Sequence, residues 1–179
     1  MSWPLPTVCL FGPESTGKTT LAGELARKFD TVFVPEFGRY YCEALGNECD
    51  ADDLRAIASG QKALEDAALR KAKTILLLDT DRVMTSVWAD VLLGHRTADL
   101  DAVERPADLY LLADVDVPFQ HDAVRYFPDQ AERQRFLERC RRELEKRRLA
   151  FVLVHGDERA RLAQALAAID ARLGVRAPA

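Results

Sequence analysis

The chain has 179 residues, a length that fits one compact domain, and its formal net charge is −4. Because nucleic-acid-binding proteins usually carry a basic surplus, this charge disfavours nucleic acid as the main partner. No apolar run approaches the roughly 20 residues of a membrane span, so we expect no membrane partner. The four cysteines form no CxxC pair, which disfavours a zinc site and favours a reduced, cytoplasmic chain.

Short apolar runs alternate with helical patterns along the chain, which predicts a parallel sheet built from βαβ units. The helical patterns repeat their apolar residues every 3.6 positions, as Leu21, Leu25 and Phe29 illustrate. These elements predict a three-layer, doubly wound α/β fold, in which ligands bind beyond the carboxyl ends of the strands. The predicted strands, in chain order, are Thr7–Phe11, Val32–Pro35, Thr74–Asp79, Asp108–Leu112 and Ala150–Val154.

The segment after the first predicted strand reads GPESTGKTT, residues 12–20. It matches the phosphate-binding pattern GxxxxGK[ST] at every fixed position, between a strand and a helix as the pattern requires. Its backbone N–H groups can surround phosphate oxygens, Lys18 is predicted to reach the β- and γ-phosphates of ATP, and Thr19 to bind Mg²⁺. The predicted nucleotide-binding residues of this loop are Gly12, Glu14, Ser15, Thr16, Gly17, Lys18, Thr19 and Thr20.

The second predicted strand leads into PEFGRYY, residues 35–41. A carboxylate at this strand end can accept the proton of an attacking hydroxyl, so we predict that Glu36 contacts the acceptor as a candidate base. Its alternatives are a helix N-cap or an ion pair with Arg39, which itself is a candidate acceptor contact. Tyr40 can offer a flat face to a ring, although aromatic residues at this spacing also fit a core. Whether Glu36 or Asp79 takes the proton stays open.

The third predicted strand, TILLLD, ends in Asp79. An acid at this place in P-loop proteins holds Mg²⁺, usually through water, and we predict this role for Asp79. Two readings of Asp81 stay equally open, an acceptor contact and the N-cap of the helical run 82–93. Gln61, which can bind the edge of a base, and Trp88 are further candidate acceptor contacts.

A basic segment before the last predicted strand fits a helical lid at about residues 119–148. An arginine that folds over the phosphates would stabilise transition-state charge and exclude water. Arg125 is the first candidate for this role and Arg133 the second. Asp157, in the loop after the last strand, is expected beside the adenine by analogy with this architecture, and it also fits an N-cap.

A phosphate loop with a candidate lid on a chain this short indicates a small-molecule kinase, a single P-loop domain over residues 1–179 that uses ATP and Mg²⁺. A GTPase is disfavoured because no NKxD-type guanine signature is present. The alternative is a regulatory module in which ATP binding or hydrolysis changes the shape that a partner recognises. The donor nucleotide and the oligomeric state stay open.

Together the segments GPESTGKTT, PEFGRYY, LLLDTD and DVPFQHDAVR resemble the ribosylnicotinamide kinase domain of NadR-type proteins, which are P-loop kinases of NAD salvage. The resemblance extends from about residue 7 to 170. It implies ATP-dependent phosphorylation of the 5′-hydroxyl of nicotinamide riboside to nicotinamide mononucleotide, and a sheet order of 2-3-1-4-5. It also implies that Glu36 and Asp79 lie beside the ribose and magnesium, and Arg125 near the phosphates.

The chain departs from the NadR-type pattern at two aromatic positions. Family members tend to carry Trp where this chain has Pro35, and Tyr near Leu64. If those rings enclose the nicotinamide, Trp88 or Tyr40 must replace them here, and a kinase for another nucleoside is the nearest alternative. NadR-type proteins often add nucleotidyltransferase and DNA-binding domains, so we expect neither adenylylation nor transcriptional control from this sequence.

Overall fold

The computed structural model describes residues 3–119, 127 and 129–178, and its core is a sheet of five parallel strands in the order β2-β3-β1-β4-β5. This architecture confirms the predicted fold class and the strand order that the NadR-type resemblance implies. The strands are β1 (Thr7–Phe11), β2 (Phe33–Val34), β3 (Leu76–Asp79), β4 (Leu109–Ala113) and β5 (Phe151–Val154).

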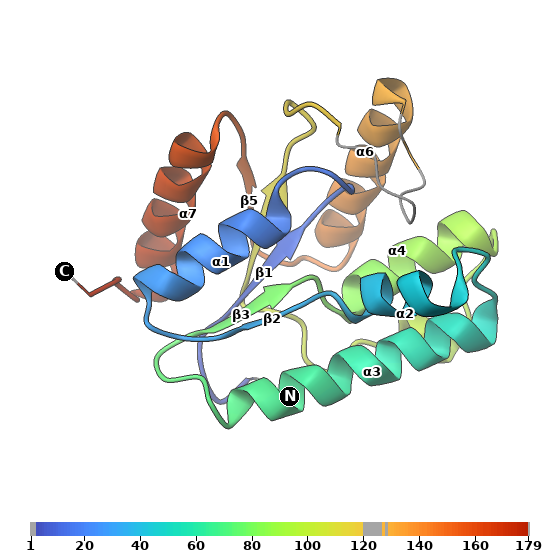
Figure 1. Ribbon diagram of the computed structural model, residues 1–179, viewed down its shortest axis with the longest axis horizontal. Helices are drawn as coiled ribbons and strands as arrows, with labels where there is room; N and C mark the ends of the chain where they lie inside the picture. The colour runs from blue at the N-terminus through green and yellow to red at the C-terminus, as the bar shows by residue number, and fades with distance from the viewer. Residues whose placement is uncertain (1–2, 120–126, 128, 179) are drawn as a thin grey trace.

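Helices cover both faces of the sheet, α1 and α7 on one face and α3, α4 and α6 on the other (Figure 1). The helices are α1 (Lys18–Lys28), α2 (Phe37–Leu45), α3 (Ala51–Leu69), α4 (Arg82–Leu92), α5 (Ala98–Asp101), α6 (Gln130–Lys146) and α7 (Glu158–Leu173). Because side chains alternate along a strand, each strand supplies both cores. In β1, Val8 and Leu10 pack toward α1 and α7, whereas Cys9 and Phe11 pack toward the opposite helices.

The observed strands differ from the predicted ones by one or two residues. The third begins two residues later than predicted and the fifth one residue later. The first strand has the predicted bounds, and the fourth is shifted by one residue. The second is only Phe33–Val34, because it pairs with β3 alone and ends before Pro35, which has no N–H to donate to a ladder. The strand predicted from apolar composition is therefore longer than the segment of β2 that pairs with β3.

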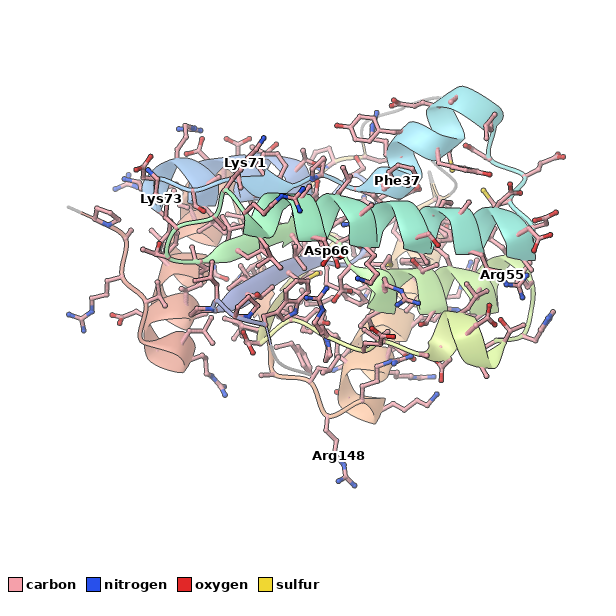
Figure 2. All side chains as sticks on the ribbon, turned by 90° about the horizontal axis from the view of Figure 1, so that it is seen from below. Phe37, Arg55, Asp66, Lys71, Lys73 and Arg148 are labelled. Atoms are coloured by element: carbon pink, nitrogen blue, oxygen red, sulfur yellow. The ribbon has the colours of Figure 1, made fainter. Side chains whose placement is uncertain are left out.

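The α2 helix reaches the carboxyl edge of the sheet because it packs closely on α3. A Cβ atom at Gly60 would lie 2.3 Å from the Phe37 ring, so only glycine permits this approach. The Gln61 side chain strengthens the contact, since its Oε1 accepts a hydrogen bond from the Phe37 N–H at 2.9 Å. Figure 2 shows Phe37 at the start of α2, beside α3. Glu36, one residue earlier, is thereby held at the sheet edge.

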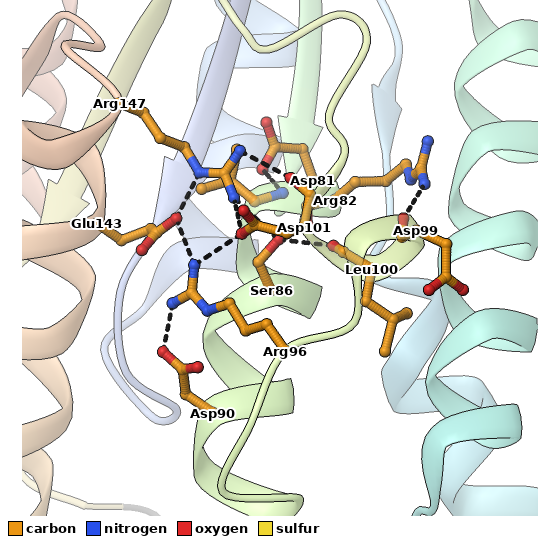
Figure 3. Close-up of polar contacts among 11 residues, drawn as sticks. Asp81, Arg82, Ser86, Asp90, Arg96, Asp99, Leu100, Asp101, Glu143 and Arg147 are labelled. Carbon is orange, nitrogen blue, oxygen red and sulfur yellow. Dashed lines mark hydrogen bonds and ion pairs between the residues drawn. The ribbon is translucent and has the colours of Figure 1, made fainter.

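A cluster of ion pairs joins α4, the loop that follows it, α5 and α6 (Figure 3). Arg96 contacts Asp90, Asp101 at 3.0 Å and Glu143 at 2.8 Å, and Arg147 contacts Glu143 and Asp101. Glu143 is only 4% exposed. Burial opposes its ionisation, but hydrogen bonds from Arg96 and Arg147 hold its pKa below the usual value. The cluster fixes α6 against the helix that follows β3.

We expect Arg96→Ala to lower the free energy of unfolding by about 2 kcal/mol, because buried Glu143 then keeps only one of its two cationic partners. The exposed Arg142–Glu138 pair is the control, and Arg142→Ala should cost less than about 1 kcal/mol. Urea unfolding at neutral pH measures both values. Equal losses in the two variants would contradict a structural role for the cluster.

Candidate active site

A cavity of about 380 Å³ follows the carboxyl edge of the sheet. One end is lined by residues 14–21, the phosphate loop and the start of α1. The other end lies among α2, α3 and α4, and the start of α7 completes the wall. Parallel α/β sheets bind ligands at this edge. The cavity therefore joins a phosphate-binding end to a second chamber within one site.

Backbone geometry shapes the phosphate loop. Gly12 has φ +124°, and a Cβ atom there would lie 2.9 Å from the Ala113 carbonyl oxygen, so the loop can approach β4 only with glycine at this position. The α1 helix begins at Lys18, and its N-cap, Gly17, provides no side-chain cap. The N–H groups of its first turn are thus available to an anion, and the helix dipole favours negative charge there.

Thr19 and Asp79, the two residues predicted to hold Mg²⁺, meet in the structure. The Thr19 hydroxyl donates a 2.5 Å hydrogen bond to Asp79 Oδ2. Asp79 is 2% exposed, and among the described residues its Oδ1 has no hydrogen-bond partner. Burial raises the pKa of this carboxyl, while Lys18 and the Thr19 hydroxyl oppose the rise. A hydroxyl beside a carboxylate with an unsatisfied oxygen suits a hard cation such as Mg²⁺ or its bound water.

Glu36 lines the cavity, and the charges of Lys18, Asp79 and Glu14 act on its carboxyl. It is the N-cap residue of α2, but its side chain makes no capping hydrogen bond. Removal from water raises the pKa of its carboxyl to about 7, with Lys18 opposing the rise and Asp79 adding to it. A carboxyl that titrates near neutral pH can exchange a proton with a bound hydroxyl. Arg39 also lines the cavity, and its Nε contacts Glu43 at 2.9 Å.

The predicted acceptor contacts Gln61 and Asp81 both lie in the cavity wall, and both have structural partners. The Gln61 amide binds the Phe37 N–H and the Thr80 carbonyl, which joins α2 to the end of β3. Asp81 caps α4 by accepting from the Val83 N–H at 3.0 Å, so the N-cap reading is confirmed. Its second oxygen accepts from the Tyr110 hydroxyl at 2.5 Å. Both side chains are therefore oriented by the fold.

Trp88 lines the second chamber together with Met84 of the same helix. Its indole stacks on Phe127, with ring centroids 5.8 Å apart and an interplanar angle of 5°. Phe136 packs against it from α6 at 4.7 Å. Cys42 and Met84, which line the cavity with Trp88, give this chamber polarisable side chains that suit a flat ring.

Three other predicted residues lie away from the cavity wall or beyond the described residues. Tyr40 is 53% exposed and does not line the cavity, which corrects its assignment as an acceptor contact. The helical period directs Gly38, Arg39 and Cys42 toward the cavity and Tyr40 away from it. Arg125 lies outside the described residues. Asp157 caps α7 through the Ala160 N–H at 2.8 Å.

Two buried arginines contact the phosphate loop. Arg133, the second lid candidate, donates to the Ser15 carbonyl at 3.1 Å. Arg161, which the sequence analysis missed, lines the cavity and donates to the Thr16 carbonyl at 3.0 Å. Its position one turn before Ala165, on the buried face of α7, is the sequence feature that could have indicated a buried arginine.

Known proteins resemble this chain over most of its length. A family model described as an AAA domain matches residues 7–161. The trifunctional NAD biosynthesis/regulator protein NadR of Escherichia coli (strain K12) is 30% identical over 158 residues, which are 85% of this chain and 38% of NadR. The resemblance to NadR-type proteins is thereby confirmed, and the chain spans less than half the length of that relative.

Solved structures show the same similarity in three dimensions. The crystal structure of NadR protein in complex with NR matches with a TM-score of 0.74 and 26% identity, over 98% of this chain and 53% of that chain. Thymidylate kinase from Candida albicans matches with a TM-score of 0.66 and 15% identity, over 93% and 92% of the two chains. The fold is therefore that of P-loop kinases. Among the described residues, no helix is both long and apolar enough to cross a membrane.

Proposed function

The chain belongs to the AAA domain family, and from its likeness to NadR we propose that it is an ATP-dependent kinase that phosphorylates the 5′-hydroxyl of nicotinamide riboside to give nicotinamide mononucleotide. The observation that carries this proposal is a single cavity whose wall includes the phosphate loop, Glu36 and Trp88. The NadR protein whose structure contains NR supports the choice of acceptor. One P-loop domain would thus hold donor and acceptor together.

In the proposed reaction the phosphate loop holds the triphosphate through its backbone N–H groups. Lys18 extends from the first turn of α1 toward the β- and γ-phosphates and offsets the charge that develops during transfer. Thr19 and Asp79 would hold Mg²⁺, which neutralises phosphate oxygens when bound. With Asp79 assigned to the metal, Glu36, which lines the cavity and has a raised pKa, accepts the proton of the 5′-hydroxyl. The hydroxyl oxygen attacks the γ-phosphorus, and the bond between that phosphorus and ADP breaks.

The acceptor ring is proposed to lie in the chamber beside Trp88. A pyridinium ring carries positive charge, and an indole face attracts a cation through its quadrupole. The buried carboxyl of Asp81 lies in the same wall and favours a cationic ring over a neutral base. These contacts would replace the family aromatics absent at Pro35 and Leu64.

The test is ADP release by the purified protein with Mg-ATP, alone and with nicotinamide riboside, ribonucleosides or deoxynucleosides. We expect nicotinamide riboside to stimulate ADP release and nicotinamide mononucleotide to accumulate in equal amount. Stimulation by another nucleoside alone would keep phosphate transfer and replace the acceptor. Slow turnover that no acceptor stimulates would favour a regulatory ATP-binding module and contradict the proposal.

We expect kcat/KM for nicotinamide riboside to fall below about pH 7, because the raised pKa leaves Glu36 protonated on the acid side and unable to accept a proton. The decline should approach about tenfold per pH unit. Glu36→Gln should lose most of the activity and this acid limb, whereas exposed Glu48→Gln should keep both. An unchanged profile in Glu36→Gln would exclude Glu36 as the base.

Trp88→Ala should raise KM for nicotinamide riboside by about tenfold and leave KM for ATP nearly unchanged, because Trp88 lies on α4, in the chamber proposed for the acceptor. Trp88→Phe keeps an aromatic face and should retain most of the affinity. Tyr40→Ala is the control, since that ring lies outside the cavity wall. Initial rates at varied acceptor concentration measure the effect. A larger effect from Tyr40→Ala than from Trp88→Ala would reverse the assignment.

A further inference from the structure

Two arginines from different helices hold neighbouring carbonyl groups of the phosphate loop. Arg133 on α6 is 1% exposed and donates to the Ser15 carbonyl at 3.1 Å. Arg161 on α7 is 4% exposed and donates to the Thr16 carbonyl at 3.0 Å. Arginine is rarely buried so fully. The two terminal nitrogens of Arg133 and all three guanidinium nitrogens of Arg161 donate to backbone or side-chain oxygens. The arrangement links both helices to the loop.

Each arginine also binds the loops that follow the strands beside the phosphate loop. Arg133 donates to the Val117 carbonyl at 3.1 Å and to Gln130 Oε1 at 3.0 Å. These bonds connect the segment after β4 with the start of α6. The phosphate loop is therefore fixed to a segment outside its own βα unit.

Arg161 has a wider set of anchors. Its guanidinium binds the Gly156 carbonyl at 2.8 Å, the Asp114 carbonyl at 3.1 Å and the carboxylate of Asp116. Asp116 also accepts from the Gly156 N–H at 2.5 Å. The loops after β4 and β5 thus meet at one side chain, which in turn holds Thr16.

The orientation of these carbonyls decides what the loop can bind. An anion-binding loop must present N–H groups to the phosphates, and a carbonyl that turned inward would repel them. Ser15 adopts φ +56°, a left-handed conformation that a residue other than glycine keeps only when its surroundings impose it. Arg133 binds the carbonyl of this same residue. A bound guanidinium keeps the carbonyl turned toward the arginine.

We propose that Arg133 and Arg161 are positioning residues for the donor triphosphate, which hold the Ser15 and Thr16 carbonyls away from the site so that the loop N–H groups face the phosphates. The proposal rests on the proposed function only in that the loop binds a polyphosphate, and it does not depend on the acceptor. It reassigns Arg133 from direct phosphate contact to control of the loop. It also gives buried Arg161 a role that no local motif suggests.

The test separates loop geometry from base and acceptor contacts by using inorganic tripolyphosphate and ADP as probes. Calorimetric Kd values are compared for Arg133→Ala, Arg161→Ala and the corresponding lysine variants. Exposed Arg139→Ala on α6 and Arg159→Ala on α7 are the matched controls. Far-UV circular dichroism and the thermal midpoint report folding, and KM for the best acceptor reports the other end of the cavity.

We expect both alanine variants to bind tripolyphosphate and ADP about tenfold more weakly or worse, with acceptor KM within about twofold of the wild type. Lysine keeps the charge but not the forked geometry, so its variants should recover only part of the affinity. Controls should match the wild type. A folded alanine variant with unchanged Kd would overturn the proposal, and so would full recovery by lysine, because a point charge would then suffice.

If an alanine variant unfolds, a less disruptive substitution tests the role of the same arginine. Asp116→Asn removes the ionic partner of Arg161 and leaves the guanidinium in place. If Asp116 orients the guanidinium toward the Thr16 carbonyl, the substitution should weaken tripolyphosphate binding by about threefold. Unchanged binding would overturn the proposed role of Arg161. For Arg133 the lysine variant serves the same purpose: weaker tripolyphosphate binding supports its role, and unchanged binding would overturn it. Failure of the nicotinamide riboside assay would leave these binding results standing, so the two hypotheses fail separately.

Discussion

Lys18→Ala is expected to reduce kcat for phosphate transfer by about 1,000-fold or more, the largest single loss that we predict. Lys18 is the first residue of α1 and 9% exposed, and its Nζ donates to the Pro13 carbonyl at 2.7 Å. The ammonium therefore lies over the phosphate loop, where no other lysine lines the cavity among the described residues. Its removal takes away a positive charge beside the loop that is proposed to hold the phosphates.

Single-turnover transfer of labelled γ-phosphate is the appropriate measurement, because it reports chemistry without product release. Lys28→Ala, at the exposed end of the same helix, is the control and should transfer phosphate at the wild-type rate. The Lys18 variant should keep its fold, because its helix remains packed through Leu21 and Leu25. Transfer that survives in a folded variant would remove the phosphate loop from the mechanism.

Asp79→Asn should have the second largest effect, a fall in kcat of about 100-fold together with a weaker apparent affinity for Mg²⁺. The amide keeps the volume of the carboxyl and can still accept from the Thr19 hydroxyl. It removes the charge, and with it the oxygen that has no hydrogen-bond partner among the described residues. The substitution therefore tests metal binding rather than packing.

Rates measured over a series of Mg²⁺ concentrations at fixed ATP give the result, with Asp30→Asn as the exposed control. Because burial raises the pKa of Asp79, its ionised form disfavours folding as pH rises above the unfolded pKa. Asp79→Asn should thus be at least as stable as the wild type at neutral pH without metal. An unchanged Mg²⁺ dependence would show that Asp79 does not hold the metal.

Much of the site was readable from local sequence. The segments around Gly12–Thr20 and Asp79 carry their chemistry in short motifs, and β1 has the predicted bounds. The N-caps at Asp81 and Asp157 also follow from near neighbours, because a cap joins residues two or three positions apart. Sheet order agreed with the NadR-type resemblance rather than with any local pattern.

The rest of the site depends on contacts between segments that are far apart in the sequence. Arg161 binds Thr16 across 145 positions of sequence, and no periodicity in α7 identifies that carbonyl as its partner. Tyr40 is exposed to solvent, whereas Trp88 lines the cavity. The difference arises because the packing of α2 and α4 determines which side of each helix faces the cavity. The composition and the spacing of residues indicate which side chains are able to take part in binding or catalysis. Which groups meet depends on long-range packing, because a side chain finds its partners only after the chain between them has folded.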